Sequence, residues 1–223
     1  MKLLYYDLNL EFELHHDKVN QLVIENPEEL EKFVIALSRR LAKNGESVEL
    51  YEDLDKLDIA KLSNLISSPM DLVYDKKEVQ KKLYETLMQE MELSSLSEEF
   101  AALSSKFLSN LDELQLYSEY DLDFDSEFNH VSLLKSFDVH LKNPEGFFVE
   151  KLIDYSKNIH RLLGKKLFIL LSCSQYLKAS DFEYLLEHAK NEEVTFLFIE
   201  SGQLYLNSDK NELIIDIDLC EIR

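Results

Sequence analysis

Residues 165–201 constrain the fold most, because a strand, an amphipathic helix and a second strand follow one another there. The apolar run at residues 167–171 ends in small polar residues, which is typical of a strand buried on both faces. Ser180 and Glu183 have the spacing of a capping box at a helix start. The apolar run at residues 194–200 completes a β-α-β crossover, which predicts a parallel sheet and an α/β core.

Further strands precede this unit. Residues 3–13 alternate imperfectly between apolar and acidic side chains, as edge or hairpin strands do, and residues 19–25 indicate another strand. Asn26 and Pro27 form a helix start, with the asparagine as cap and the proline at the first helical position. Residues 48–51 and 62–66 add two short strand patterns. The fold class predicted from these elements is α/β.

The middle of the chain is helical. Apolar residues of 75–92 fall on one helix face, and a second helix is predicted after Ser95, which has Glu98 at capping-box spacing. Its apolar stripe consists of Leu96, Phe100, Leu103, Phe107, Leu111 and Leu114. Asn143 and Pro144 predict the start of a third helix that ends at Gly164. We therefore predict an α/β head domain at residues 1–90 and 164–223, with an inserted α-helical leg domain at residues 91–163.

The glycine content excludes one large class of phosphate-binding site. The chain contains only Gly45, Gly146, Gly164 and Gly202, and these are too far apart for a GxxxxGK[ST] loop or a GxGxxG fingerprint. A Mg²⁺-positioning acid is also missing from the end of the strand at residues 167–171. We therefore expect no nucleotide hydrolysis, and we expect that the protein is not an enzyme.

Charge is the unusual property of this composition. The sequence has 44 Asp and Glu residues against 24 Lys and Arg residues, a net charge of −20, which repels nucleic acid unless the cations gather on one surface. The densest basic cluster is Lys76, Lys77, Lys81 and Lys82. Helical spacing places Lys77 and Lys81 on the face opposite the apolar stripe with Tyr84 beside them, Lys82 at the flank, and Lys76 in the first turn. Two interpretations remain open, a solvated helix face or a nucleic-acid contact. No apolar run approaches the roughly 20 residues of a membrane span, so we expect no membrane partner and a cytoplasmic location.

In contrast to the lysine cluster, one long stretch of the chain is acidic. Residues 107–134 contain no Lys or Arg, and acids alternate with other residues near their centre. The side chains concerned are those of Glu119, Asp121, Asp123, Asp125 and Glu127. In an extended segment such acids place hard oxygen ligands on one side, which suits Ca²⁺, whereas the alternative is a mobile acidic loop.

Taken together, the pattern resembles the Csn-two family of type II-A CRISPR systems. The resemblance rests on five runs in the same order and at similar spacing. In chain order, they are Glu-Tyr-Asp-Leu-Asp from residue 119, Leu-Leu-Lys-Ser from residue 133, Lys-Lys-Leu-Phe-Ile-Leu-Leu-Ser from residue 165, Tyr-Leu from residue 176 and Val-Thr-Phe-Leu-Phe-Ile-Glu from residue 194. The resemblance extends over nearly the whole chain and is strongest at residues 119–137 and 165–200.

This resemblance implies a function. Proteins of the family are non-enzymatic homotetrameric rings that bind the ends of double-stranded DNA, depend on Ca²⁺ for their assembled shape, and support spacer acquisition with the CRISPR integrase proteins and the RNA-guided nuclease. Their head is a degenerate P-loop-like α/β domain without nucleotide-binding residues. The family's calcium-binding carboxylates map onto Glu119, Asp121, Asp123, Asp125 and Glu127, although one extra residue follows Asp125 here. A ring that encloses a duplex needs inward cations, which reconciles DNA binding with an acidic chain.

Two other classes of function remain. One is a metal-dependent phosphoryl-transfer or hydrolytic α/β enzyme, whose carboxylates would hold a catalytic ion. The other is a purely protein-binding scaffold that uses the acidic run as a docking site. A gel shift on linear duplex, with and without Ca²⁺, distinguishes the three classes.

Overall fold

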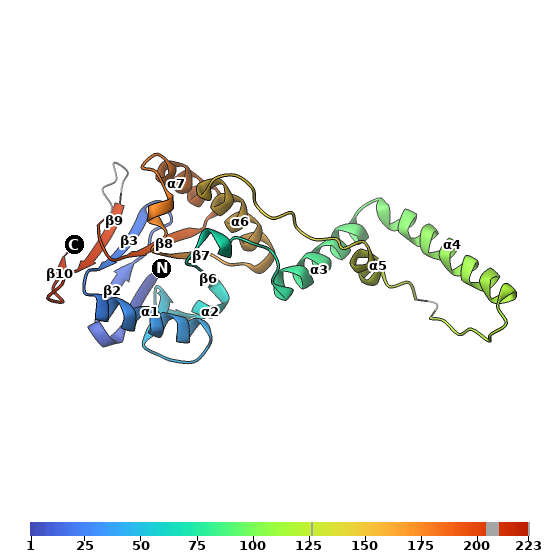
Figure 1. Cartoon of the computed structure of the whole chain (residues 1–223), viewed down its shortest axis with the longest axis horizontal. Coiled ribbons are helices and arrows are strands. Elements are labelled where there is room, and N and C mark those ends of the chain that lie inside the picture. The colour runs from blue at the N-terminus through green and yellow to red at the C-terminus, as the bar shows by residue number, and fades with distance from the viewer. Residues whose placement is uncertain (126, 204–209, 223) are drawn as a thin grey trace. The chain divides into compact units, whose positions relative to one another are not determined.

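The structure, a computed structural model, describes residues 1–125, 127–203 and 210–222. In this part of the chain it is a mixed α/β fold with two β-sheets and seven α-helices. Figure 1 shows how the chain runs through these elements. The chain divides into two compact units. The first unit comprises Met1–Val73 and Asn143–Arg223, and the second unit is Tyr74–Lys142.

The unit limits differ from the predicted domain limits of residues 1–90, 91–163 and 164–223. Helix α6 (Phe148–Leu163) belongs to the first unit, where it packs against α7 (Asp181–Glu192). Helix α3 (Lys77–Leu93) belongs to the second unit, where it packs against α4 (Leu96–Tyr117) and α5 (His130–Ser136). The two compact units are defined by contacts within the chain, and such contacts do not test where the head and leg domains begin and end. The predicted domain boundaries therefore remain a prediction.

The larger sheet forms the centre of the first unit. Its strands lie in the order β10 (Glu221–Ile222), β9 (Lys210–Ile215), β3 (Val19–Ile24), β8 (Thr195–Glu200), β7 (Leu167–Leu171) and β6 (Ser63–Ile66). The five strands from β9 to β6 are parallel, and β10 pairs antiparallel with β9. The β7-α7-β8 crossover was therefore predicted correctly, with Phe168 opposite Phe196 and Leu170 opposite Phe198.

A smaller antiparallel sheet packs on the same core. Its order is β2 (Leu10–Glu13), β1 (Lys2–Tyr5), β4 (Val48–Glu52) and β5 (Asp55–Leu57). Of the edge and hairpin strands that the pattern at residues 3–13 left open, the structure has a hairpin, with 3₁₀ helix η1 (Tyr6–Leu8) between its strands. The remaining short elements of the first unit are α2 (Ile59–Leu62), η2 (Pro69–Asp71) and η3 (Ser174–Tyr176).

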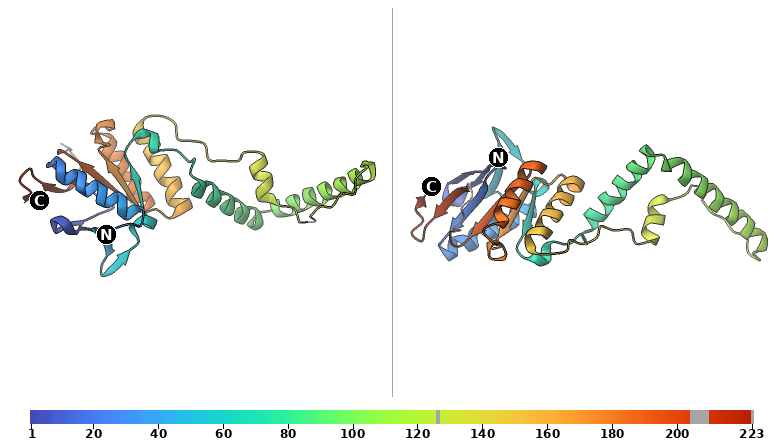
Figure 2. Two further views of the ribbon diagram at one scale, coloured as in Figure 1. Left: turned by 60° about the horizontal axis from the view of Figure 1, so that its bottom comes forward. Right: turned by 90° about the horizontal axis from the view of Figure 1, so that it is seen from above.

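Strand alternation decides which layer covers each face of the larger sheet. Leu197 and Ile199 of β8 belong to one buried cluster together with Phe33 of α1 (Pro27–Leu41) and the apolar residues of the smaller sheet. Phe196 and Phe198 point to the other face, where the Phe198 ring lies 5.2 Å from that of Phe182 in α7. Figure 1 and Figure 2 show the same arrangement, with α1 on one side of the sheet and α6 and α7 on the other. Covering both faces explains why β8 is buried along its whole length.

Helix starts were predicted less well than helices. Asn26 caps α1 as expected, because its side chain accepts hydrogen bonds from the backbone N–H groups of Glu28 and Glu29. The capping boxes at Ser180 and Ser95 are wrong, since both residues already have helical backbone angles and neither side chain makes a cap hydrogen bond. Other side chains accept hydrogen bonds near these helix starts. The Asp181 carboxylate accepts one from the Lys178 backbone N–H, and the Ser94 hydroxyl accepts one from the Leu96 backbone N–H.

The helix expected from Asn143 begins later than predicted. Gly146 has a φ of 99°, which is incompatible with a right-handed helix, so α6 starts at Phe148. The Glu150 carboxylate then accepts a hydrogen bond from the Phe147 N–H. Gly164 ends α6 in the left-handed conformation, as predicted.

The second unit consists of helices and an irregular segment. Besides α3 it contains α4 (Leu96–Tyr117) and α5 (His130–Ser136), and the irregular segment joins these two helices. Helix α3 contacts both α4 and α5. The predicted helices at residues 75–92 and after residue 95 are therefore confirmed, with boundary shifts of a few residues.

Glu49 of β4 is a buried carboxylate that collects three hydrogen-bond donors. The hydroxyl groups of Tyr6 and Tyr51 each donate to it at 2.7 Å, and the Lys56 ammonium donates to its other oxygen. Burial acts to raise the pKa of Glu49, but the bonds from Lys56, Tyr51 and Tyr6 outweigh it and lower the pKa to about 2.

Replacing this carboxylate tests the arrangement through the pH dependence of stability. Glu49→Gln should reduce the free energy of unfolding at pH 7 by roughly 1–3 kcal/mol, because three hydrogen-bond donors lose an ionised acceptor that is itself buried. The pKa is lower in the folded than in the unfolded state, so this stabilisation is present above the ordinary value of 4.5 and is lost as pH falls toward 2. Urea denaturation at pH 7, 5 and 3 should show the difference from wild type shrinking. Glu52→Gln, at the exposed end of the same strand, is the control, and a pH-independent difference would contradict the assignment.

Candidate nucleic-acid interface

Helix α3 separates an apolar face from a cationic face. Val79 and Leu83 are buried, and the four lysines predicted to contact nucleic acid, Lys76, Lys77, Lys81 and Lys82, are all exposed. Lys76 lies just before the helix with extended backbone angles, rather than in its first turn. Tyr84, which was predicted to lie beside the lysines, lines a groove together with Lys77 and Lys81, although only 7% of its surface is exposed.

Two of the four lysines line a groove within the second unit. The groove has a volume of about 630 Å³, and Lys77 and Lys81 lie along it with Gln80 and Gln89 of the same helix. Residues of α5 form the other side, among them Lys135 and Val131. Lys135 was not predicted as a site residue, because it is the sole cation of its short helix and belongs to no basic cluster in the sequence.

Glu85 is the acid in this groove. Its carboxylate oxygens lie 2.9 Å from the Lys82 ammonium and 3.8 Å from the Lys81 ammonium, at helical spacings of three and four residues. The hydrogen bond from Lys82 is the largest cause that lowers the pKa of Glu85, and the charges of Lys82 and Lys81 add to it. Glu85 is therefore ionised at neutral pH and offsets part of the local positive charge.

The five predicted calcium ligands lie in the irregular segment between α4 and α5. Glu119, Asp121, Asp123, Asp125 and Glu127 are all exposed, and Ser126 between them lies outside the described residues. Asp125 accepts a hydrogen bond from the Glu127 N–H at 2.9 Å. Across residues 1–125, 127–203 and 210–222, no three His, Cys, Asp or Glu side chains form a group that could hold a metal ion. The carboxylates thus have suitable ligand chemistry, but this structure does not gather them, and the assignment stays a prediction.

Aromatic contacts hold the C-terminal end of this segment against α4. The Phe128 ring packs edge-to-face on Phe107, with ring centroids 5.7 Å apart, and on His130 at 5.2 Å. His130 in turn contacts Phe100, and its ring nitrogen lies 3.4 Å from the Ser104 hydroxyl. Asn129 caps α5 by accepting a hydrogen bond from the Ser132 N–H. Part of the predicted apolar stripe of α4 therefore serves to anchor α5.

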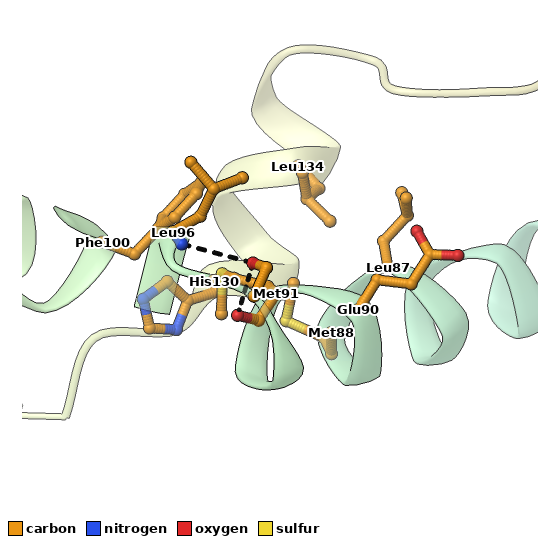
Figure 3. A pocket seen from close by; sticks show the side chains of 9 residues that line it. Leu87, Met88, Glu90, Met91, Leu96, Phe100, His130 and Leu134 are labelled. Atoms are coloured by element: carbon orange, nitrogen blue, oxygen red, sulfur yellow. Dashed lines mark hydrogen bonds between the residues drawn. The ribbon is translucent and has the colours of Figure 1, made fainter. Parts of the chain in front are cut away.

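An apolar pocket of about 350 Å³ lies beside this anchor (Figure 3). Its lining comes from α3, the α3–α4 turn, α4 and α5, and consists mainly of Leu87, Met88, Met91, Leu96, Phe100 and Leu134, with His130 at one side. Such a lining suits an apolar side chain better than a charged substrate. The pocket therefore offers no phosphate-binding chemistry.

No helix in the part of the chain that the structure describes is both long and apolar enough to cross a membrane.

Comparisons with known proteins agree with the resemblance found in the sequence. Residues 41–219 match the family model described as CRISPR-associated protein (Cas_Csn2). The comparison with curated proteins gives no match. A solved structure, described as the crystal structure of Stu0660 of Streptococcus thermophilus, is similar with a TM-score of 0.65 and 17% sequence identity, over 97% of this chain and 74% of that chain. At this identity the structural likeness shows the fold alone. The family match covers most of the chain, and the protein therefore belongs to the Cas_Csn2 family of CRISPR-associated proteins.

Proposed function

We propose that this protein is a non-enzymatic, ring-forming protein that binds double-stranded DNA at its ends and supports CRISPR spacer acquisition. The observation that carries the DNA-binding part is the α3–α5 groove, which is lined by three lysines and one glutamate in a chain of net charge −20. Ammonium groups gathered in this way attract phosphates, and binding is driven by the release of counterions from DNA. Contacts of this kind position a protein on DNA without reading its sequence.

The head supports a non-catalytic role through the connection between β3 and α1. In a P-loop fold this connection is a glycine-rich loop whose backbone N–H groups bind phosphate. Here it consists of Glu25 and Asn26, and the Asn26 side chain already accepts hydrogen bonds from the first N–H groups of α1. Glu28 and Glu29 add negative charge at the same helix end. We therefore infer a degenerate P-loop-like head that does not hold nucleotide phosphates.

The enzyme alternative finds little support in the titratable groups of the first unit. Glu200 ends β8, next to β3, but burial raises its pKa and its carboxylate accepts the Ser174 N–H at 3.0 Å. His188 and Ser156 form a hydrogen bond of 2.9 Å, but both are buried, and burial lowers the pKa of His188. These groups act as satisfied core contacts rather than as ligands of a catalytic ion.

Self-association is proposed from the uncovered part of the α4 stripe. Phe100 and Phe107 contact His130 and Phe128, whereas Leu103 and Leu114 of the same stripe remain more than half exposed. Leucines at this spacing on one helix face are suited to packing against another helix. A second copy of the chain is the proposed occupant, in a homotetrameric ring.

The remaining parts of the proposal follow from the family. We propose that the ring acts in the cytoplasm beside the CRISPR integrase proteins and the RNA-guided nuclease. Ca²⁺ is the proposed ion because the carboxylates of residues 119–127 are hard oxygen ligands. Since these side chains are not gathered here, ion binding requires the exposed segment to close on itself. A protein-binding scaffold remains the second candidate, and the α4 stripe is the observation that favours it.

The DNA interface is tested by reversing its charge. Lys77→Glu combined with Lys81→Glu should abolish binding of linear duplex while leaving the fold intact, because both side chains are exposed and lie off the apolar face of α3. Single alanine replacements of Lys76, Lys77, Lys81 and Lys82 should lower the log–log salt slope by about 0.9 for each phosphate that is no longer neutralised. Fluorescence anisotropy at several salt concentrations measures both quantities.

Lys106→Glu, at an exposed position of α4, is the control for a charge reversal away from the groove. If the α3 variants keep the wild-type affinity for DNA and the wild-type salt slope, the DNA-binding surface lies elsewhere on the protein. Absence of any wild-type binding would favour the scaffold. The enzyme alternative is tested by running the same protein–DNA mixtures on a denaturing gel. Cleaved DNA would support that alternative.

Assembly is tested on α4. Leu103→Glu combined with Leu114→Glu should shift the mass measured by light scattering from tetramer toward smaller species, because two charges would be buried between helices. The control is Leu116→Glu. Leu116 is also exposed, but it lies on the opposite side of the same helix. If the Leu103→Glu, Leu114→Glu double variant and the Leu116→Glu control both have the wild-type mass, the α4 stripe is not the interface.

Calcium binding is tested by removing two of the exposed acids. Asp121→Asn combined with Asp123→Asn should remove Ca²⁺-dependent thermal stabilisation and Ca²⁺-dependent DNA binding together. The reason is that gathered carboxylates repel one another by about 1 kcal/mol per close pair in water unless a cation compensates. Asp112→Asn combined with Glu113→Gln, on α4, keeps the same change in charge and is the control. No calorimetric heat at millimolar Ca²⁺, or persistence of both effects in the double variant, would refute the assignment.

A further inference from the structure

We propose that the groove between α3 and α5 is a phosphate-binding channel in which Lys135 is the third cation and Glu85 is a built-in competitor for the incoming phosphates. This inference deepens the proposed DNA-binding function and rests on it. It adds one residue to the interface that no basic cluster reveals, and it assigns a regulatory role to an acid.

The first step is the position of Lys135. Lys77 and Lys81 line the groove from α3, and Lys135 lines it from α5, so the cations lie on two sides of one concave surface. Helix α5 is held in place on this surface by its direct packing on α3 and by the Asn129 cap. In addition, the Gln80 side chain donates a hydrogen bond of 2.5 Å to the Val139 carbonyl, which fixes the segment after α5 to α3. Lys135 is thus presented by an anchored element rather than by a free loop.

The second step is the role of Glu85. Its carboxylate pairs with Lys82 at 2.9 Å and with Lys81 at 3.8 Å, and the side chains of all three are at least 44% exposed. Exposed pairs of this kind are weak and screened by salt. A phosphate that enters the groove therefore replaces the carboxylate as the partner of Lys81 at little cost. Glu85 makes the empty groove less attractive to anions and so selects for ligands that carry several phosphates.

The third step is the choice of ligand. The charged part of the lining consists of three ammonium groups against one carboxylate, and Tyr84, Met88 and Val131 make up its apolar part. The side-chain amide of Gln89 can add a hydrogen bond to a phosphate oxygen, whereas that of Gln80 already donates to the Val139 carbonyl. A groove open along a helix fits a phosphodiester backbone better than a small enclosed anion. The chemistry shared by duplex, single strand and inorganic polyphosphate is the chain of phosphates, and the experiment separates these sources.

The test compares Lys135→Ala, Glu85→Gln and the control Lys106→Ala by anisotropy with a labelled linear duplex over a range of salt. Lys135→Ala should lower the log–log salt slope by about 0.9, as expected when one phosphate is no longer neutralised. Glu85→Gln should tighten binding several-fold at low salt, and the gain should disappear when Lys81 and Lys82 are both alanine. Lys106→Ala should match wild type. Lys135→Gln provides a second variant if alanine disturbs α5, with circular dichroism as the check of folding.

Calorimetry with a single-stranded oligonucleotide and with inorganic polyphosphate separates the two levels of the proposal. If wild type binds duplex but Lys135→Ala matches Lys106→Ala and Glu85→Gln gives no gain, the channel is refuted and the DNA-binding function stands. If wild type binds only polyphosphate, or only the single strand, and this binding disappears with Lys135→Ala, the channel stands and duplex binding is refuted. Binding of none of the three probes refutes both.

Discussion

The pairing of β8 between β3 and β7 is the constraint on which the rest of the structure depends. Every residue of β8 is buried, and its side chains alternate between two layers. Leu197 and Ile199 join the cluster that contains α1 and the smaller sheet, whereas Phe198 packs on Phe182 of α7. Burial of each such side chain contributes about 1.5–3 kcal/mol. One strand therefore holds both layers of the first unit together.

The same burial determines which polar groups the first unit tolerates. Asn20 of β3 is fully buried, and its side chain bonds to both backbone groups of His15, to the Phe196 carbonyl and to the Asn211 side chain. Glu49 and the His188–Ser156 pair are satisfied in similar ways. Because these groups use their hydrogen bonds internally, the candidate chemistry of this protein lies in the second unit.

The second unit separates three surface chemistries along its helices. Cations line the α3–α5 groove, acids occupy the exposed segment before α5, and Leu103 and Leu114 of the α4 stripe remain uncovered. A chain of net charge −20 can bind a polyanion only through such local separation, because the average field repels it. The contact of Phe128 with Phe107 joins the acidic segment to α4, next to the helix that carries Lys135.

The sequence by itself determined the crossover at residues 165–201, the apolar faces of the helices and the lysine cluster, because these depend on periodicity within one element. Local signals failed at Ser180, Ser95 and Asn143, where a turn or the positive φ of Gly146 moved the helix start. Only the tertiary structure decided that Tyr84 is buried, that Glu85 pairs with two lysines of its own helix, and that Lys135 shares a groove with Lys77 and Lys81. The physical reason is that a groove is formed by packing between α3 and α5, which lie far apart in the chain, and no local pattern encodes that packing.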